Sequence, residues 1–134
     1  MKEFKIFKKE DILDNMDLLM DFYAKRYDSN YNIALKNSSH VCCCIEDGKI
    51  VGACRLITDY CSHTSIVDLV VDREKRRNGI GRRLMEDAIK CILELNTYYN
   101  NISTDPKNPW LKDFYESLGF KSRENYFTLT YPKE

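Results

Sequence analysis

The stretch from Ser65 to Leu95 places an apolar segment, a loop rich in glycine and arginine, and a helical pattern in direct succession. Its first part, "SIVDLVV" over residues 65–71, is mostly β-branched and apolar, which predicts a strand that is buried on both faces. From Ile80 onward the apolar residues recur at helical spacing, so a helix is expected to begin beside Gly79 and Gly81. The first N–H groups of such a helix point outward at the positive end of its dipole, which makes the junction suitable for an anion.

The loop itself, "KRRNGIGRRL" over residues 75–84, combines two residue types that suit a phosphate group. Glycine allows tight turns and keeps side chains away from a ligand, and the guanidinium of arginine matches phosphate oxygens. The loop is not a P-loop, because no G-x-x-x-x-G-K-[ST] string occurs, and Leu84 stands where a dinucleotide-binding fingerprint needs its third glycine. Taken alone, the stretch leaves open a second interpretation, a helix start with solvated arginines.

The remaining segments predict further strands and helices on both sides of this unit. They comprise a strand at 3–7, a helix from Asp11 to Tyr23, a loop or short helix at 26–39, a hairpin at 41–57 with its turn at Asp47-Gly48, a strand at 100–105, a helix at 109–118 that ends at Gly119, and a final strand or hairpin near 125–131. Together these elements predict an α/β (α+β) fold, in which helices pack on the faces of a mixed sheet.

Length and charge limit the classes of protein to which the chain can belong. Its 134 residues are enough for one domain, residues 1–134, and too few for two ordinary ones. The 21 basic and 21 acidic residues balance, which disfavours a dedicated nucleic-acid binder. No run approaches ~20 apolar residues and the N-terminal stretch has no long apolar segment, so neither a membrane span nor a signal peptide is expected.

The six cysteines form no C-x-x-C pair, and His40 and His63 complete no zinc pattern, so no metal site is expected. Without a signal peptide, we expect a cytoplasmic protein. Its cysteines should then be reduced thiols, because glutathione and thioredoxin keep cytoplasmic thiols reduced. In "VCCCI", residues 41–45, cysteine takes the place of a small hydrophobic residue in a strand. A disulfide or redox role for Cys43 is the alternative interpretation.

Two short motifs at a suitable separation give the chain a resemblance to a known family. The first is Arg76-x-x-Gly79-x-Gly81, and the second is Asn108 followed seven residues later by Tyr115 and then by Gly119-Phe120. This pattern resembles the signatures of the GNAT superfamily of N-acetyltransferases, especially its small single-domain members, and the order of elements is similar to theirs. The resemblance implies a mixed, mostly antiparallel sheet of about six to seven strands flanked by helices, with a splayed strand pair that binds acetyl-CoA.

The resemblance also implies which residues hold acetyl-CoA. Its pyrophosphate would lie on backbone amides of the loop, and its pantetheine arm would run along residues 66–71 like an added strand, paired with backbone groups of Leu69 and Val71. That strand would part from the next one near residues 102–104, which leaves those groups accessible. The expected binding residues are Leu69, Val70, Val71, Arg76, Arg77, Asn78, Gly79, Ile80, Gly81, Arg82, Asn108 and Tyr115.

Acyl transfer to an amine needs one group that takes a proton and one that gives a proton. Asp68 is the candidate base, because a carboxylate beside the thioester can deprotonate the amine directly or through water. The alternative is a structural aspartate, and the position where many relatives carry a glutamate is Val67 here. Tyr115 is the candidate acid, because a tyrosine pKa near ~10 lies only about 1.5 above that of a thiol and allows transfer to the leaving thiolate. A core aromatic is the alternative for Tyr115.

The sequence defines the other site residues less sharply. Glu46 and Asp59 are weaker candidates for the base, and the N–H of Val70 is a candidate donor to the oxyanion that forms during transfer. Four tyrosines fall in segments that usually bound the acceptor in this fold, where they would line an aromatic slot or be ordinary half-buried residues: Tyr23, Tyr27, Tyr31 and Tyr126.

The expected function is that of an acetyl-CoA-dependent N-acetyltransferase, which moves an acetyl group to a primary amine of a small molecule or protein by direct attack on the thioester. Two alternatives stay open: a non-catalytic CoA-binding module that acts through a partner, and an enzyme that acetylates a macromolecule such as a protein or tRNA. No membrane partner is expected, the charge balance disfavours nucleic acid, and a homodimer is left open. The sequence does not identify the acceptor.

Overall fold

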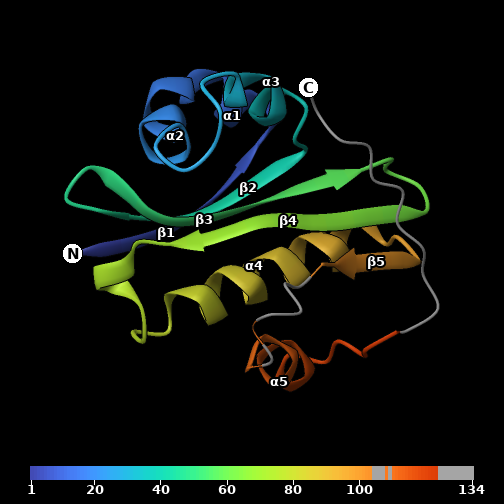
Figure 1. Ribbon diagram of the computed structural model, residues 1–134. Helices are drawn as coiled ribbons and strands as arrows, with labels where there is room; N and C mark the ends of the chain where they lie inside the picture. Colours follow the sequence, from blue (N-terminus) through green and yellow to red (C-terminus); the bar gives the residue numbers. More distant parts are fainter. Residues whose placement is uncertain (104–107, 109, 124–134) are drawn as a thin grey trace, which may run out of the picture. The chain divides into compact units, whose positions relative to one another are not determined.

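A computed structural model describes residues 1–103, 108 and 110–123 of the chain (Figure 1). Contacts within the chain group it into two units, Met1–Ser103 and Thr104–Glu134, which are described separately below. The strand or hairpin expected near 125–131, like Tyr126, lies outside the described residues. That element and the single domain over 1–134 therefore stay predictions.

The first unit is built around a five-stranded sheet with the strand order β1-β2-β3-β4-β5. Its strands are β1 Lys2–Lys8, β2 His40–Glu46, β3 Lys49–Thr58, β4 His63–Val71 and β5 Tyr99–Ile102. The first four strands pair antiparallel, and β5 joins β4 in parallel. A mixed, mostly antiparallel sheet is thus confirmed, although the described residues contain five strands and not the expected number of about six to seven.

Helices cover both faces of this sheet. Three short helices lie over one face, and α4, Ile80–Leu95, lies over the other (Figure 1). The short helices are α1 Lys9–Asp14, α2 Met16–Tyr23 and α3 Tyr31–Lys36. A single 3-10 turn, Arg73–Lys75, connects the end of β4 to the loop that precedes α4. The layered arrangement agrees with the helix positions expected from the sequence, and α3 shows that the polar stretch 26–39 contains a short helix.

The helix expected from Asp11 to Tyr23 is two helices that are divided at Asn15. Asn15 has φ −125° and ψ 27°, outside the helical range, and its side-chain amide donates to the carbonyl of Asp11 at 2.8 Å. A side-chain amide that occupies a backbone acceptor competes with the helical pattern, which explains why a continuous periodicity did not give one helix. Ile12 and Tyr23 nevertheless remain fully buried, so both helices keep the expected apolar face.

The β2–β3 hairpin turns at Asp47 and Gly48, as the sequence predicts. Their φ angles of 53° and 77° are both left-handed, which is the backbone of the tight turn that matches the twist of paired strands. Ile45 pairs with Ile50 on the two sides of this turn. The Asp-Gly pair therefore sets where β3 begins, and a register shift between Cys44 and Ile45 then leaves Val51 as an extra residue of β3.

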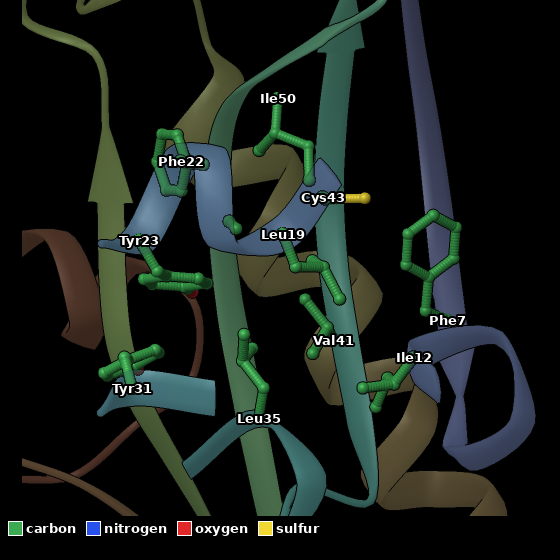
Figure 2. Packing of buried hydrophobic residues seen from close by; sticks show 11 residues of the cluster. Phe7, Ile12, Leu19, Phe22, Tyr23, Tyr31, Leu35, Val41, Cys43 and Ile50 are labelled. Atoms are coloured by element: carbon green, nitrogen blue, oxygen red, sulfur yellow. The ribbon is translucent and has the colours of Figure 1, made fainter. Parts of the chain in front are cut away.

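The cysteines of β2 are packed as small hydrophobic residues. Cys43 joins Val41 and the aromatic side chains under α1–α3 (Figure 2), while Cys42 pairs with Cys54 across the strands. Cys42, Cys43 and Cys44 are all fully buried, and burial raises the pKa of the Cys43 thiol to about 12. Such a thiol is nearly always protonated at neutral pH, so its environment supports the packing interpretation over a reactive one.

The second unit contains α5, Trp110–Ser117. The helix ends as expected at Gly119, whose φ is 100°, and the N–H of Phe120 bonds back to the carbonyl of Tyr115 at 3.1 Å. The side chain of Tyr115 is buried, with its ring centroid 5.2 Å from that of Phe114. None of the helices in the described ranges has the length and hydropathy of a membrane span.

Candidate active site

The second half of β4 has a strand on only one side in the described part of the chain. β5 pairs with β4 only from His63 to Ile66, whereas β3 follows β4 to Val71. The side chains from Val67 to Val71 are therefore half-buried, and the expectation of a strand buried on both faces was wrong for this half. The pairing of β4 with β5 ends at Ile66 and Ile102, and the splay expected near residues 102–104 stays a prediction because it extends outside the described residues.

A β-bulge interrupts β4 at Asp68. Val67 pairs with Arg55 and Val70 pairs with Ala53, so two residues of β4 lie opposite Cys54 alone. Asp68 has φ 54°, a left-handed value that is unusual for a residue other than glycine inside a strand. Because amide direction alternates along a strand, the extra residue decides which N–H groups beyond it face the open edge of β4.

Side chains from three neighbouring elements hold this bulge. The hydroxyl of Tyr23 donates to the carbonyl of Asp68 at 3.1 Å, and the hydroxyl of Tyr31 donates to the carboxylate of Asp68. Arg55 on β3 donates to the same carboxylate from Nε and forms an ion pair with it through Nη2, each at 3.1 Å. We call Tyr23, Tyr31, Arg55 and Asp68 the bulge cluster.

Sequence reasoning selected Asp68 but missed Arg55. The signal was present: a lone charged residue in the otherwise apolar stretch "VGACRLI", where a strand side chain facing the core needs a buried partner. The Arg55 side chain is 11% exposed and that of Asp68 is 27% exposed, so the pair is shielded from most of the solvent. The carboxylate proposed as a base from sequence is thus also the counter-ion of a buried guanidinium.

The three tyrosines from the acceptor-side segments form one cluster, in which the ring centroids of Tyr23 and Tyr27 lie 5.9 Å apart. The ring centroid of Tyr31 lies 4.7 Å from that of Tyr23 and 4.8 Å from that of Tyr27. Burial, with a smaller contribution from neighbouring Asp68, raises the pKa of Tyr31 and Tyr27, and burial raises that of Tyr23 most strongly, so these hydroxyls remain donors at neutral pH. Tyr23 and Tyr31 belong to the core (Figure 2), and only Tyr27, 39% exposed, offers a ring to a ligand.

The loop from Lys75 to Gly81, which we call the anion loop, turns twice through left-handed backbone. Arg77 has φ 65° and Gly79 has φ 77°. The side-chain amide of Asn78 donates to the carbonyls of Lys75 and Arg76 at 3.1 and 3.4 Å, so it holds these acceptors away from the helix start. A helix start with its neighbouring carbonyls occupied presents mainly N–H groups, which is the arrangement that favours an anion.

Several side chains of the anion loop and its surroundings already have roles within the protein. Nε of Arg76 donates to the carbonyl of Val71 at 3.1 Å and so ties the loop to the end of β4. Glu46 forms an ion pair with Lys75 at 2.6 Å. Asp59 accepts hydrogen bonds from the backbone N–H groups of residues 61, 62 and 63, which hold the pKa of its carboxyl well below the usual range. Both of the weaker base candidates are thus engaged in structural contacts.

Two glycines near the start of α4 differ in what they permit. A Cβ added at Gly52 on β3 would lie 3.0 Å from Cγ2 of Ile80, so this glycine lets the helix start approach the sheet. A Cβ added at Gly81 would meet Cγ2 of Val71 only at 3.8 Å, an ordinary contact. The fold therefore needs Gly52 more than Gly81, and the importance of Gly52 was not recognised from the sequence.

One protein-family model matches most of the chain, including the segments described above. The model of the acetyltransferase (GNAT) family matches residues 10–120, which include α2, β4, the anion loop, α4 and α5. The chain belongs to the GNAT acetyltransferase family. The matched range contains both motifs that carried the resemblance, the anion loop and Asn108–Phe120, and membership in the family implies acetyl-CoA as the co-substrate.

One curated protein and several solved structures are similar to this chain. GCN5-related N-acetyltransferase 2, chloroplastic, from Arabidopsis thaliana is 27% identical over 77 residues, which make up 58% of this chain and only 29% of that protein. An aminoglycoside acetyltransferase from an uncultured soil metagenomic sample, crystallised with sisomicin, is 20% identical with a TM-score of 0.71, over 99% of this chain and 97% of that one. A GNAT family protein from Streptococcus pneumoniae is 24% identical with a TM-score of 0.71, over 97% and 98%.

A further structure shows a related fold with both substrates represented. AAC(6')-Iy in complex with the bisubstrate analogue CoA-S-monomethyl-acetylneamine has a TM-score of 0.69 and 14% identity, over 100% of this chain and 99% of that one. TM-scores of 0.69 to 0.71 show that these structures and this chain share a fold. Among its described residues, no group of three or more histidine, cysteine or acidic side chains could hold a metal ion.

Proposed function

We propose that this chain transfers the acetyl group of acetyl-CoA to a primary amine of a small molecule or a protein. The observation that carries the proposal is the direct continuity of three features: the open edge of β4, the anion loop and the start of α4. An acyl donor with a long amide-containing arm and a pyrophosphate needs such a continuous strip of backbone donors and acceptors.

The chain's own residues fit this donor. The amides from Arg77 to Arg82, in the anion loop and the first helical turn, would hold the pyrophosphate, and the backbone of Leu69 and Val71 would pair with the arm. Gly81 supports the fit, because its hydrogen leaves room at the helix start that the fold itself does not require. Asn108 and Tyr115 of the second unit are the remaining residues proposed to bind acetyl-CoA.

The proposed chemistry assigns one role to each of three groups. Asp68 takes a proton from the attacking amine, directly or through water, from its place at the bulge. The N–H of Asp72 donates to the carbonyl of Val51 on β3 at 2.8 Å, so by alternation the N–H of Val70, the candidate from the sequence, also faces β3. The oxyanion of the thioester carbonyl is therefore assigned to the N–H of Leu69 on the open edge. Tyr115 gives its phenolic proton to the leaving thiolate. The thioester supplies the activated acyl group, and no metal takes part in this scheme.

The acceptor lies, in this proposal, beside the exposed ring of Tyr27 next to the bulge cluster. An aromatic face that is half-exposed and backed by two further rings suits a cationic amine or the apolar face of a sugar. The aminoglycoside acetyltransferases among the structural neighbours make amino sugars a reasonable class to test first. The reduced cysteines fit a cytoplasmic location, and a homodimer remains compatible with the proposal.

A panel of amines tested with acetyl-CoA, with release of the free thiol as the readout, examines this proposal. It should include an aminoglycoside, a polyamine and a lysine peptide, and the Asp68→Asn variant should be run beside the wild type. We expect thiol release that depends on the amine, and a lower rate for Asp68→Asn at unchanged CoA affinity. Tight CoA binding without turnover on any amine would favour the non-catalytic module, and turnover only on a protein or charged tRNA would favour the macromolecular acceptor.

A further inference from the structure

Arg55 is a buried cation that none of the proposed chemical steps uses. It lies in the middle of β3 between Cys54 and Leu56, both fully buried, and its side chain is 11% exposed. Removing a guanidinium from water is costly unless each donor finds a partner, so its contacts show what the buried charge is used for.

The contacts of Arg55 join three separate segments around the bulge. Its Nε donates to Tyr31 Oη at 2.7 Å and to the carboxylate of Asp68 at 3.1 Å, and its Nη2 pairs with the same carboxylate. Its Nη1 donates to Ser38 Oγ at 3.3 Å, just beyond α3. The guanidinium also lies 5.4 Å from the ring centroid of Tyr31. One side chain thus connects both ends of α3 to the bulge in β4.

The bulge needs such support. A left-handed φ at a residue other than glycine costs on the order of 1 kcal/mol, and regular pairing with β3 would relieve it. Regular pairing would shift the strand by one residue and turn each N–H group from Leu69 to Val71 toward the opposite edge. It would also move Val71, whose Cγ2 lies where side chains at Gly52 and Gly81 would point, away from the start of α4.

We propose that Arg55 is a positioning residue for acetyl transfer: it acts through Asp68 to hold the bulge, and with it the direction of the N–H groups and of the carboxylate at the reacting end of β4. The proposal rests on the proposed function, since it assigns Arg55 a part in that reaction. It makes Arg55 a residue that touches neither donor nor acceptor, and its effect on the rate depends on the presence of the Asp68 carboxylate.

Kinetics of single and double variants test the positioning role. Arg55→Gln should lower kcat by about 10- to 100-fold, the scale of a small misplacement of reacting groups, with a smaller rise in the KM for acetyl-CoA because Leu69 and Val71 also pair with its arm. Arg55→Lys should recover part of the loss. In an Asp68→Asn background, Arg55→Gln should lower kcat by less than about threefold, because the group through which it acts is gone. An equal loss in both backgrounds would overturn the proposal.

A matched control comes from a second arginine–aspartate pair on the same face. Arg26 pairs with Asp72 just beyond β4, and its side chain, 29% exposed, is also partly buried. Arg26→Gln removes the same kind of cation without touching the bulge, so its kcat should stay within about threefold of the wild type. A loss in Arg26→Gln as large as that in Arg55→Gln would indicate a general effect of removing charge, and would overturn the specific role.

Amide hydrogen exchange in the ligand-free protein tests the same inference without relying on activity. Arg55→Gln should speed exchange at the amides of residues 67–71 that pair with β3, and should leave residues 63–66 unchanged. Arg26→Gln should change neither segment. Unchanged exchange in Arg55→Gln would overturn the proposal. Faster exchange together with a wild type that acetylates no amine would refute the proposed function instead, while supporting Arg55 as the support of the bulge.

Discussion

The anion loop and the bulge cluster sit at neighbouring points of β4, yet they are built from different parts of the chain. The anion loop is made by consecutive residues, and its character comes from left-handed backbone at Arg77 and Gly79 and from amides at a helix start. The bulge cluster is made by side chains from α2, α3, β3 and β4, and its character comes from an ion pair and two phenolic donors.

This difference suggests that donor affinity and transfer rate depend on separate residues. Backbone amides bind the donor equally well before and during reaction, so changes in the anion loop should appear mainly as affinity. Groups placed against the reacting atoms act in the transition state, so changes there should appear mainly in kcat. Substitutions that change either CoA affinity or kcat, but not both, are therefore a direct test of this division.

The largest effect is expected at Tyr115, a residue outside both regions. Tyr115→Phe keeps the ring that packs against Phe114 and removes only the hydroxyl. If that hydroxyl protonates the leaving thiolate, kcat should fall by roughly 10²- to 10⁴-fold, the usual range for a general acid. CoA affinity, measured by calorimetry, should remain nearly unchanged. Wild-type turnover, on a substrate for which chemistry is rate-limiting, would show that Tyr115 is a packing residue.

Gly81→Ala should produce the clearest loss of affinity. The fold accepts a Cβ there, 3.8 Å from Val71 Cγ2, and alanine is a better helix former than glycine by up to ~1 kcal/mol, so stability should not fall. A phosphate on the helix start would meet the new methyl group, and we expect CoA to bind more than about tenfold more weakly, or ~1.4 kcal/mol. Unchanged affinity in calorimetry would remove the pyrophosphate from the anion loop.

The same contrast explains how much could be predicted from the sequence. The anion loop, the Asp47-Gly48 turn and the cap at Gly119 were all found, because each depends on residues next to one another in the chain. The cysteine strand was found for a similar reason, since burial follows from a local apolar run. These features need no knowledge of which distant segments come together.

The bulge cluster could not be predicted in this way. Asp68 was selected as a carboxylate, but its left-handed φ and its pair with Arg55 depend on the register between β3 and β4. That register is a tertiary property with no local signature, and so is the approach of α4 that Gly52 permits. The break at Asn15 was missed for another reason, because an asparagine is tolerated in helices unless its side chain captures a nearby carbonyl.

Gly52→Ala should have a stability effect opposite in sign to that of Gly81→Ala. Its Cβ would approach Cγ2 of Ile80 to 3.0 Å and Cδ1 of Leu84 to 3.3 Å, so these side chains, or the start of α4 that carries them, must shift by a few tenths of an ångström. Overpacking of this kind costs about 1 kcal/mol or more, which urea unfolding would detect. Because the anion loop moves with the helix, CoA affinity should fall as well. A variant as stable as the wild type would show that the helix start is not fixed against β3.

The smallest effect is expected at His40, which belongs to neither the anion loop nor the bulge cluster and affects how stability depends on pH. His40 is buried at the start of β2, and burial, followed by the nearby charge of Lys8, lowers its pKa from 6.5. Between the folded and unfolded pKa values the unfolded chain binds more protons, so stability rises with pH there and is lost as pH falls below about 6.5. Urea unfolding at pH 7 and pH 5 should show a smaller acid-induced loss of stability in His40→Gln than in the wild type. An identical loss of stability in His40→Gln would show that another group causes the acid-induced unfolding.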